Sequence, residues 1–230
     1  MSDDPMLLDD FRGKIRLFPL PNLVLYPYVI QPLHVFEPRY RQLMADALDD
    51  DRLMALALLQ PGWEEDYHKR PPIYPGICIG RIFKEERLSD GRYNLLLHGV
   101  SRARVVDELP TGTLYRTARV ELLTDVPVSS ESVEKDLREE LGQRMSRWFA
   151  AQPAAVDQLH KLLQSGLSLG ALCDMFAFAL PLDLAIKQQL LEEVDVAQRT
   201  SYLLAQLAAQ LPREEAHSGI RRFPPDFSTN

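Results

Sequence analysis

The hydrophobic pattern of this chain changes its period near residue 127. Before that point, apolar residues alternate with polar ones, as in Tyr93 to Val106, which is typical of β-strands. After it, apolar residues recur every three or four positions, which is typical of helices that cover a core with one face. A chain that is mostly strand and then all helix predicts an α+β protein with two packed subdomains, joined near Val126–Ser132.

The strands of the first part are predicted from apolar runs between turn signals. They are expected at Ile15–Phe18, Leu33–Phe36, Leu53–Leu59, Ile77–Phe83, Tyr93–Val106 and Tyr115–Leu122. Leu53–Leu59 has helical propensity, but its length and its place indicate a buried strand. Gly80 marks a bulge, Gly91 belongs to an Asp-Gly hairpin turn, and Gly99 lets a long strand bend. In the last strand, Ala118, Val120 and Leu122 are expected to face inward.

The long strand is also predicted to carry polar side chains on its outer face. Its alternation places His98, Arg102 and Arg104 opposite Leu95 and Leu97. Arginines on an outward strand face are usually solvated, and we interpret both in this way; the alternative is that they hold an acidic partner. We interpret His98 as a polar surface residue rather than a ligand or base.

Helices are predicted throughout the second part. The first places Val133, Leu137, Leu141, Met145 and Trp148 on one stripe. Val156–Leu163 is the second, and Leu169–Leu180, apolar nearly all round, is the buried one. Asp183 and Asp195 are expected to cap two more, the last ending at Pro212. We predict subdomains at 14–126 and 127–212, with a flexible arm at 1–13 and a flexible tail at 213–230.

The segment from Phe18 to Tyr40 combines prolines with short apolar runs. Pro19, Pro21 and Pro27 cannot donate to a sheet ladder, so the residues between them belong to short, bent strands. Glu37-Pro38 then begins a helix, because proline is tolerated in the first turn and a carboxylate favours that end. This helix is expected to bury Tyr40, Leu43, Met44 and Ala47.

Composition and charge narrow the function classes. Hydrophobic residues make up 46% of the 230, charged residues 26%, and the net charge is −7. The chain therefore lacks the basic field that nucleic-acid binding needs. Cys78 and Cys173 lie in apolar runs and are expected to be reduced core residues. Without a signal peptide or a membrane-spanning run, the pattern predicts a cytoplasmic protein.

Residues 60–76 form a long proline-rich loop that carries three aromatic side chains, those of Trp63, Tyr67 and Tyr74. Long loops in compact domains are commonly functional. One interpretation is that these aromatics fold back as a lid over the barrel and bury their faces. The other is that some stay accessible and anchor an extended peptide.

Motifs for catalysis, metal binding or cofactor binding are not found in the sequence. The phosphate-binding loop Gly-x-x-x-x-Gly-Lys-Ser/Thr does not occur. The five histidines show no metal-ligand spacing to one another or to the cysteines. We therefore expect no catalytic residue, metal or cofactor.

Two proline-punctuated motifs connect the chain to a known family. Phe-Pro-Leu-Pro-x-x-Val-Leu-x-Pro at 18–27 and Pro-Leu-x-Val-Phe-Glu-Pro-Arg-Tyr at 32–40 resemble the opening of the N-terminal substrate-binding domain of the Lon proteases. The likeness extends over roughly residues 14–211. The residues that carry it include Phe18, Pro19, Leu20, Pro27, Phe36, Glu37, Pro38, Arg39, Tyr40, Gly80, Gly91, Gly99 and Arg102. One departure is Tyr28, where the family commonly has glycine.

The resemblance implies a PUA-like, mostly antiparallel β-barrel followed by a helical bundle. It implies a non-catalytic module that binds unfolded or damaged polypeptide, with a protease or chaperone as partner, as an adaptor or regulator in protein quality control. The ATPase and Ser-Lys peptidase modules of a Lon protease are not in this chain, which favours a stand-alone domain. Two alternatives are an RNA-binding PUA-like module, which the acidic charge disfavours, and an enzyme with a site between barrel and bundle.

Overall fold

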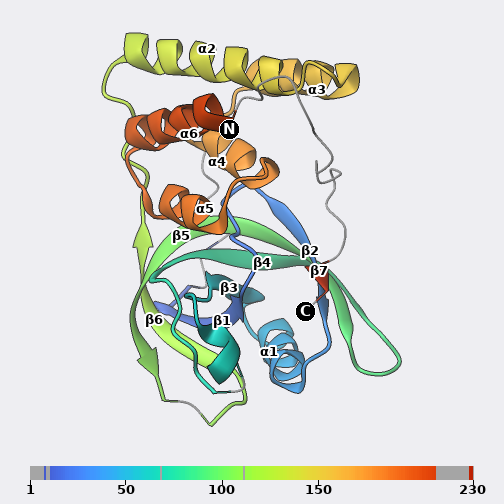
Figure 1. Ribbon diagram of the computed structural model, residues 1–230. Helices are drawn as coiled ribbons and strands as arrows, with labels where there is room; N and C mark the ends of the chain where they lie inside the picture. The colour runs from blue at the N-terminus through green and yellow to red at the C-terminus, as the bar shows by residue number, and fades with distance from the viewer. Residues whose placement is uncertain (1–7, 9–10, 68, 111, 211–227, 230) are drawn as a thin grey trace.

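A barrel of β-strands lies beside a stack of helices in the computed structural model, which describes residues 8, 11–67, 69–110, 112–210 and 228–229 (Figure 1). The strands are β1 (Lys14–Leu20), β2 (Ile30–Val35), β3 (Leu53–Leu58), β4 (Gly76–Arg87), β5 (Tyr93–Leu109), β6 (Arg116–Leu123) and β7 (Ser228–Thr229). The helices are α1 (Pro38–Leu48), the 3-10 helix η2 (Trp63–Asp66), α2 (Glu131–Trp148), α3 (Pro153–Leu163), α4 (Leu169–Ala179), α5 (Leu184–Glu192) and α6 (Val196–Gln210).

Strand pairing closes the sheet into a ring. The strand order is β4-β3-β1-β6-β5-β2-β7, and β4 also pairs with β5, so β4, β3, β1, β6 and β5 form a closed circuit. The β1–β3 and β2–β7 pairs are parallel and the other pairs are antiparallel. The predicted α+β fold with a mostly antiparallel barrel is confirmed.

Glycines lie at three irregular points of the barrel. The register of β4 against β5 shifts between Ile79 and Gly80, which is the predicted bulge. Gly91 has a φ of +81° in the turn of the β4–β5 hairpin, a conformation that favours glycine. A Cβ at Gly99 would lie 2.0 Å from the carbonyl oxygen of Tyr26, so this position needs glycine for close backbone approach.

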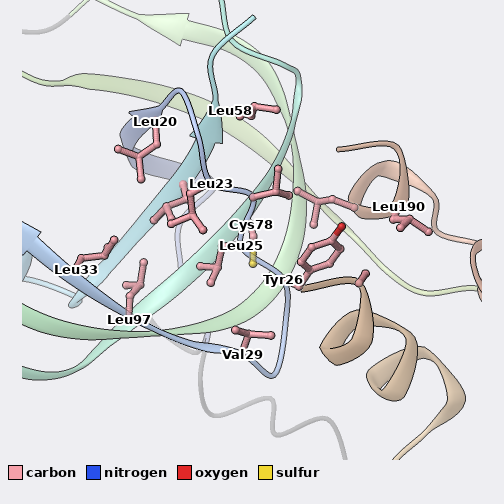
Figure 2. Close-up of a cluster of buried hydrophobic side chains, with 14 of the residues drawn as sticks. Leu20, Leu23, Leu25, Tyr26, Val29, Leu33, Leu58, Cys78, Leu97 and Leu190 are labelled. Carbon is pink, nitrogen blue, oxygen red and sulfur yellow. The ribbon is translucent and has the colours of Figure 1, made fainter. Parts of the chain in front are cut away.

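The buried strand β3 is apolar throughout because both of its faces are covered. Its residues alternate between two clusters of buried side chains: Leu53, Ala55 and Ala57 belong to one, and Met54, Leu56 and Leu58 to the other. The larger cluster continues from the barrel into α1 and the helical part. The segment between β1 and β2 contributes to it, and Figure 2 shows Tyr26 of this segment on the side of the barrel that faces the helix carrying Leu190.

The short helix α1 begins as the sequence predicts. Glu37 occupies the N-cap position with extended backbone, and Pro38 lies in the first turn. The buried face consists of Tyr40, Leu43, Met44 and Ala47, the predicted stripe. The Tyr40 ring lies 4.1 Å from the Phe18 ring by centroids, and its hydroxyl donates to the Pro19 carbonyl at 3.2 Å. These contacts join α1 to β1.

Helices α2 to α6 stack on one side of the barrel, with α5 nearest to the strands and α2 and α3 farthest away, whereas α1 lies apart from them (Figure 1). The buried helix is α4, whose residues are mostly inaccessible to solvent, as its composition predicts. Asp195 caps α6, because the amide of Gln198 donates to its carboxylate at 2.9 Å. Asp183 occupies the N-cap position of α5 without a side-chain capping bond.

Two predicted inward side chains are exposed instead. Leu122 lies beyond the part of β6 that pairs with β1, which ends at the pair Lys14↔Arg119. Past that point β1 no longer flanks this strand, so the Leu122 side chain remains exposed. Val133 is also exposed, since the packed stripe of α2 begins one turn later, at Leu137.

The predicted arm and tail fall largely outside the described residues. Of the arm, residues 1–13, Leu8 and Phe11 pack against the smaller apolar cluster. Of the tail, residues 213–230, Ser228 and Thr229 form β7 alongside β2. Backbone pairing crosses the predicted boundary between the two subdomains near residue 126. Val126 forms a β-bridge with Asp195, at the start of α6.

Candidate functional site

The 60–76 loop is attached to the beginning of α1 by a cluster that we call the loop cluster: Glu37, Arg39 and Tyr67. The Tyr67 hydroxyl donates to Glu37 Oε1 at 2.6 Å, and Arg39 pairs with Glu37 Oε2 at 2.9 Å. The Arg39 guanidinium also lies 4.6 Å from the Tyr40 ring centroid and 4.7 Å from that of Tyr67. Through Glu37, which pairs with Arg39 and accepts from Tyr67, the loop is held onto the helix.

Trp63 lies near the beginning of this loop, in the 3-10 helix η2. Gly62 precedes it with a φ of +87°, which turns the chain into the helix. The Trp63 ring meets the Tyr67 ring edge-on, with centroids 5.5 Å apart. Its side chain is partly exposed, and the following residues Glu64, Glu65 and Asp66 are exposed acids, of which Asp66 pairs with Lys69 at 2.7 Å. The loop thus presents an aromatic ring within an acidic surface.

Tyr74 lies where the loop returns to the barrel. Its amide donates to the Leu58 carbonyl at 2.9 Å, and its partly buried ring packs against the larger apolar cluster. Ile73 forms a bridge with Leu59, and Arg116 donates to the Pro71 carbonyl at 2.8 Å. Of the three aromatics in the loop, Tyr67 and Tyr74 hold it in place, and Trp63 lies in η2, Trp63–Asp66, which we call the loop tip.

A cavity of about 10 Å³ separates the loop from α1, lined by Arg39, Tyr40 and Tyr67 among others. This is roughly the space that one water molecule needs. The described residues of the loop therefore pack closely against α1 and the neighbouring part of the barrel.

Arg102 is buried rather than solvated, which corrects the expectation from strand alternation. Its side chain is 3% exposed and forms an ion pair with Asp174 of α4. Its Nε also donates to the Leu191 carbonyl at 3.0 Å. Arg102 points into the interface between barrel and helices, where the outer face of β5 is covered. Arg104, two residues on, is exposed as expected.

Four charged residues form what we call the interface cluster: Arg102, Asp125, Asp174 and Arg199. Arg199 donates to Asp125 Oδ1 at 2.9 Å and lies 3.4 Å from Asp174 Oδ1. Arg102 lies 3.4 Å from Asp125. The cluster joins β5, the segment after β6, α4 and α6, and its two arginines balance its two carboxylates.

Burial and ion pairing act in opposite directions on the charged groups of this interface. Burial raises the pKa of Asp174 even though Arg102 and Arg199 oppose that shift. Burial alone lowers the pKa of Arg102, but the Asp174 carboxylate brings it above its ordinary value, so the guanidinium stays charged. Desolvation therefore costs the carboxylate more than the ion pairs recover.

Neighbouring polar groups complete the barrel–helix interface. The buried Tyr26 hydroxyl donates to the Lys187 carbonyl at 2.5 Å. Gln188 donates to the Gly76 carbonyl at 2.8 Å. Cys78 and Cys173 are buried free thiols, and burial raises the pKa of Cys173 to about 12. Both are inert core residues, as predicted. These contacts fill the interface between barrel and helices, which is where the alternative interpretation placed an enzyme site.

The described residues contain neither a metal-binding cluster nor a membrane-spanning helix. No group of three or more histidine, cysteine, aspartate or glutamate side chains among them is arranged to hold a metal ion. No helix of the described chain has the length and apolar character needed to cross a membrane. His98 is half-buried, and burial lowers its pKa.

The remaining residues of the two sequence motifs lie in β1, in the turn before β2 and directly after β2. Phe18, Pro19 and Leu20 lie in β1 with their side chains buried, and Pro27 is buried just after Tyr26. Phe36 follows β2 and is 40% exposed. Tyr28, where the family commonly has glycine, has a φ of +66°. The turn therefore keeps the left-handed backbone that glycine favours, with a tyrosine in its place.

A scan against family models matches residues 14–209 to the substrate-binding domain of the ATP-dependent protease La, or Lon. Among curated proteins, Lon protease 2 of Herpetosiphon aurantiacus is 28% identical over 217 residues, covering 92% of this chain and 26% of that protein. Lon protease 2 of Myxococcus xanthus is 29% identical over 200 residues, covering 85% and 24%. The chain thus spans about a quarter of the length of these relatives.

Two solved structures share the fold. The N-terminal domain of the Mycobacterium avium complex Lon protease superposes with a TM-score of 0.67 at 17% identity, covering 86% of this chain and 98% of that domain. A Lon N-terminal domain protein from Xanthomonas campestris gives a TM-score of 0.61 at 24% identity, covering 87% of this chain and 100% of that protein. Both likenesses include the barrel and the helices.

Proposed function

The chain belongs to the family of the Lon substrate-binding domain, and on this premise we propose that it is a non-catalytic module that binds unfolded or damaged polypeptide. The observation that carries the proposal is the extent of the family match, residues 14–209, which takes in barrel and helices together. Its role is that of an adaptor or regulator in cytoplasmic protein quality control, with a protease or chaperone as partner.

The Trp63 tip is the part of the surface that best suits such a client. An unfolded polypeptide offers apolar side chains in many sequences, so a receptor needs rigid apolar anchors more than a fixed hydrogen-bond pattern. Trp63 supplies a large ring, and Tyr67 and Glu37 fix the base of the loop beneath it. Glu64, Glu65 and Asp66 favour clients with basic residues beside their apolar stretch.

The two alternatives receive less support. RNA binding needs a basic surface, and the chain carries a net charge of −7. An active site between barrel and helices needs an accessible cleft with titratable groups, and the charged groups at that interface are paired and mostly buried.

Fluorescein-labelled β-casein, an unfolded protein, serves as the probe in an anisotropy titration of the purified chain. We expect saturable binding that polyuridylic acid does not displace. Trp63→Ala should weaken this binding by about 1–3 kcal/mol, the cost of losing an aromatic anchor, with a small change in thermal midpoint.

Phe83→Ala is the matched control, because Phe83 is 68% exposed on β4, away from the loop. Absence of casein binding by the wild-type chain contradicts the proposed function. If Trp63→Ala instead lowers the thermal midpoint by many degrees and leaves binding per folded molecule unchanged, Trp63 is a packed lid and the client binds elsewhere.

A further inference from the structure

Among the described residues, strand β2 has one edge paired with β5 in the barrel and one edge paired only with the short strand β7. On the barrel side it pairs with β5 over six positions, from Ile30↔His98 to Val35↔Tyr93. On the other side it pairs with β7 over two, Leu33↔Ser228 and His34↔Thr229 (Figure 1). Apart from Pro32, which has no backbone N–H, the residues of β2 that β7 does not pair can offer backbone groups on this edge to another strand.

The outward side of β2 carries apolar and aromatic side chains, which we call the outer row: Ile30, His34 and Phe36. Ile30 is 44% exposed and Phe36 40% exposed, although edge strands commonly carry charges that prevent further pairing. The rings of His34 and Phe36 stack with centroids 6.2 Å apart. A strand added beside β2 would place alternate side chains next to this row.

From these observations we propose that the open edge of β2 is a docking site for an extended polypeptide segment, added as a further strand, and that the chain's own Ser228–Thr229 occupies part of it. The inference rests on the proposed function and names the kind of contact by which the client binds. Main-chain pairing suits a receptor for unfolded clients, because every extended segment offers the same backbone groups whatever its side chains.

The edge also leads towards the loop tip. Phe36 follows the last residue of β2, and the next residue, Glu37, accepts the hydrogen bond from Tyr67. A segment running parallel to β2, in the direction that β7 takes, would continue past Phe36 to the base of the loop that carries Trp63. The strand edge and the aromatic tip then act on one client, which raises the total affinity without a specific sequence.

The chain's own strand gives the first test. Ser228→Pro removes the backbone donor and prevents β7 from pairing, whereas Ser228→Ala changes the side chain and keeps that donor. Since β7 competes with the client, Ser228→Pro should bind labelled β-casein at least about twofold more tightly than Ser228→Ala, as expected when an intramolecular competitor is removed. Equal affinities of the two variants for β-casein would overturn the proposal that β7 competes with the client for this edge.

The edge itself gives the second test. Ile30→Lys places a charge on the outer row, and Phe83→Lys places the same charge on β4, away from the edge. Casein binding should weaken by up to about fivefold in the first variant, the range of one cross-strand pair, and stay unchanged in the second. In the ¹⁵N-labelled wild-type chain, casein should shift the amide signals of β2.

The outcomes separate this inference from the proposed function. Casein binding that responds to Trp63→Ala but not to Ser228→Pro or Ile30→Lys, with unshifted β2 amides, keeps the proposed function and overturns the docking edge. Absence of casein binding in the wild-type chain and in Ser228→Pro overturns both. If Ile30→Lys fails to fold, the two Ser228 variants and the amide shifts still decide.

Discussion

Two clusters of arginine and carboxylate hold different parts of this molecule together, and they differ in exposure. The interface cluster joins the barrel to α4 and α6, and the side chains of Asp174 and Arg199 are inaccessible to solvent. The loop cluster joins the 60–76 loop to α1, and the side chains of Glu37 and Arg39 remain partly exposed. Both clusters pair arginine with carboxylate, but Arg102, Asp174 and Arg199 of the interface cluster are buried and only Asp125 is partly exposed, whereas every side chain of the loop cluster is partly exposed.

This difference in solvent access determines what each cluster does. Buried charges are costly to desolvate, so the interface cluster adds little net stability when intact but costs much when one partner is removed. Partly exposed charges exchange their partners for water at small cost. The interface cluster therefore fixes how the helices sit on the barrel, and the loop cluster orients a surface segment that can be altered without unfolding the protein.

Asp174→Ala should give the largest effect, because it leaves Arg102 and Arg199 without the carboxylate between them. We expect the free energy of unfolding to fall by about 3–5 kcal/mol, measured by urea denaturation. Asp107→Ala, which breaks the exposed pair with Arg119, should cost no more than about 1 kcal/mol. Equal losses in the two variants would show that burial does not separate these ion pairs.

Gly99→Ala tests the backbone contact on the same side of the barrel. The added methyl group would lie 2.0 Å from the Tyr26 carbonyl oxygen, and backbone cannot move aside as a side chain does. We expect a loss of about 1–3 kcal/mol in unfolding free energy, the usual cost of overpacking. Gly112→Ala, which has nothing within 4 Å of the added carbon, should be close to neutral. A neutral Gly99→Ala would mean that β5 has room there.

Tyr67→Phe tests the loop cluster. It removes the hydrogen bond to Glu37 and keeps the ring beside Arg39 and Trp63. The unfolding free energy should fall by about 0.5–1.5 kcal/mol, the net value of one hydrogen bond. Limited proteolysis should cut faster within 60–76 in this variant, while α1 and β5 keep wild-type protection. Equal loss of protection in α1 and β5 would mean that the loop cluster supports the whole barrel.

His98 should give the smallest effect, through pH. Burial lowers its pKa from the ordinary value of 6.5, so the unfolded chain takes up the proton first as the pH falls. Stability should therefore decrease as the pH drops through that value and below it. Urea midpoints measured from about pH 7.5 to about pH 5.5 should fall more steeply in the wild type than in His98→Gln. Parallel pH dependences of the urea midpoint in the two proteins would contradict the lowered pKa of His98.

The fold was largely predictable from the sequence, since local patterns carry it. Continuous apolar residues from Leu53 to Leu58 indicated a buried strand, and both faces of β3 are covered. Strand ends were less predictable: β4 continues to Arg87 and β5 to Leu109. The polar residues of the long hairpin pair through their backbones, which periodicity does not detect.

The candidate site was predictable in part. The three aromatics of the loop were recognisable from composition, but the division of roles among Trp63, Tyr67 and Tyr74 depends on which ring meets Glu37, the core or solvent. The open edge of β2 was not recognisable, because the sequence does not show the order of the strands in the sheet or how much of each edge is paired.

What the sequence alone determined is the succession of elements, the stripe buried by α1 and the family, because each depends on residues close together in the chain. Only the tertiary structure determines that the Arg102 side chain is buried. Alternation along β5 placed it outside the barrel, and its partner Asp174 lies 72 positions away in α4. Period-two patterning tells which side of a strand a residue faces, but not whether solvent or another layer of the protein covers that side.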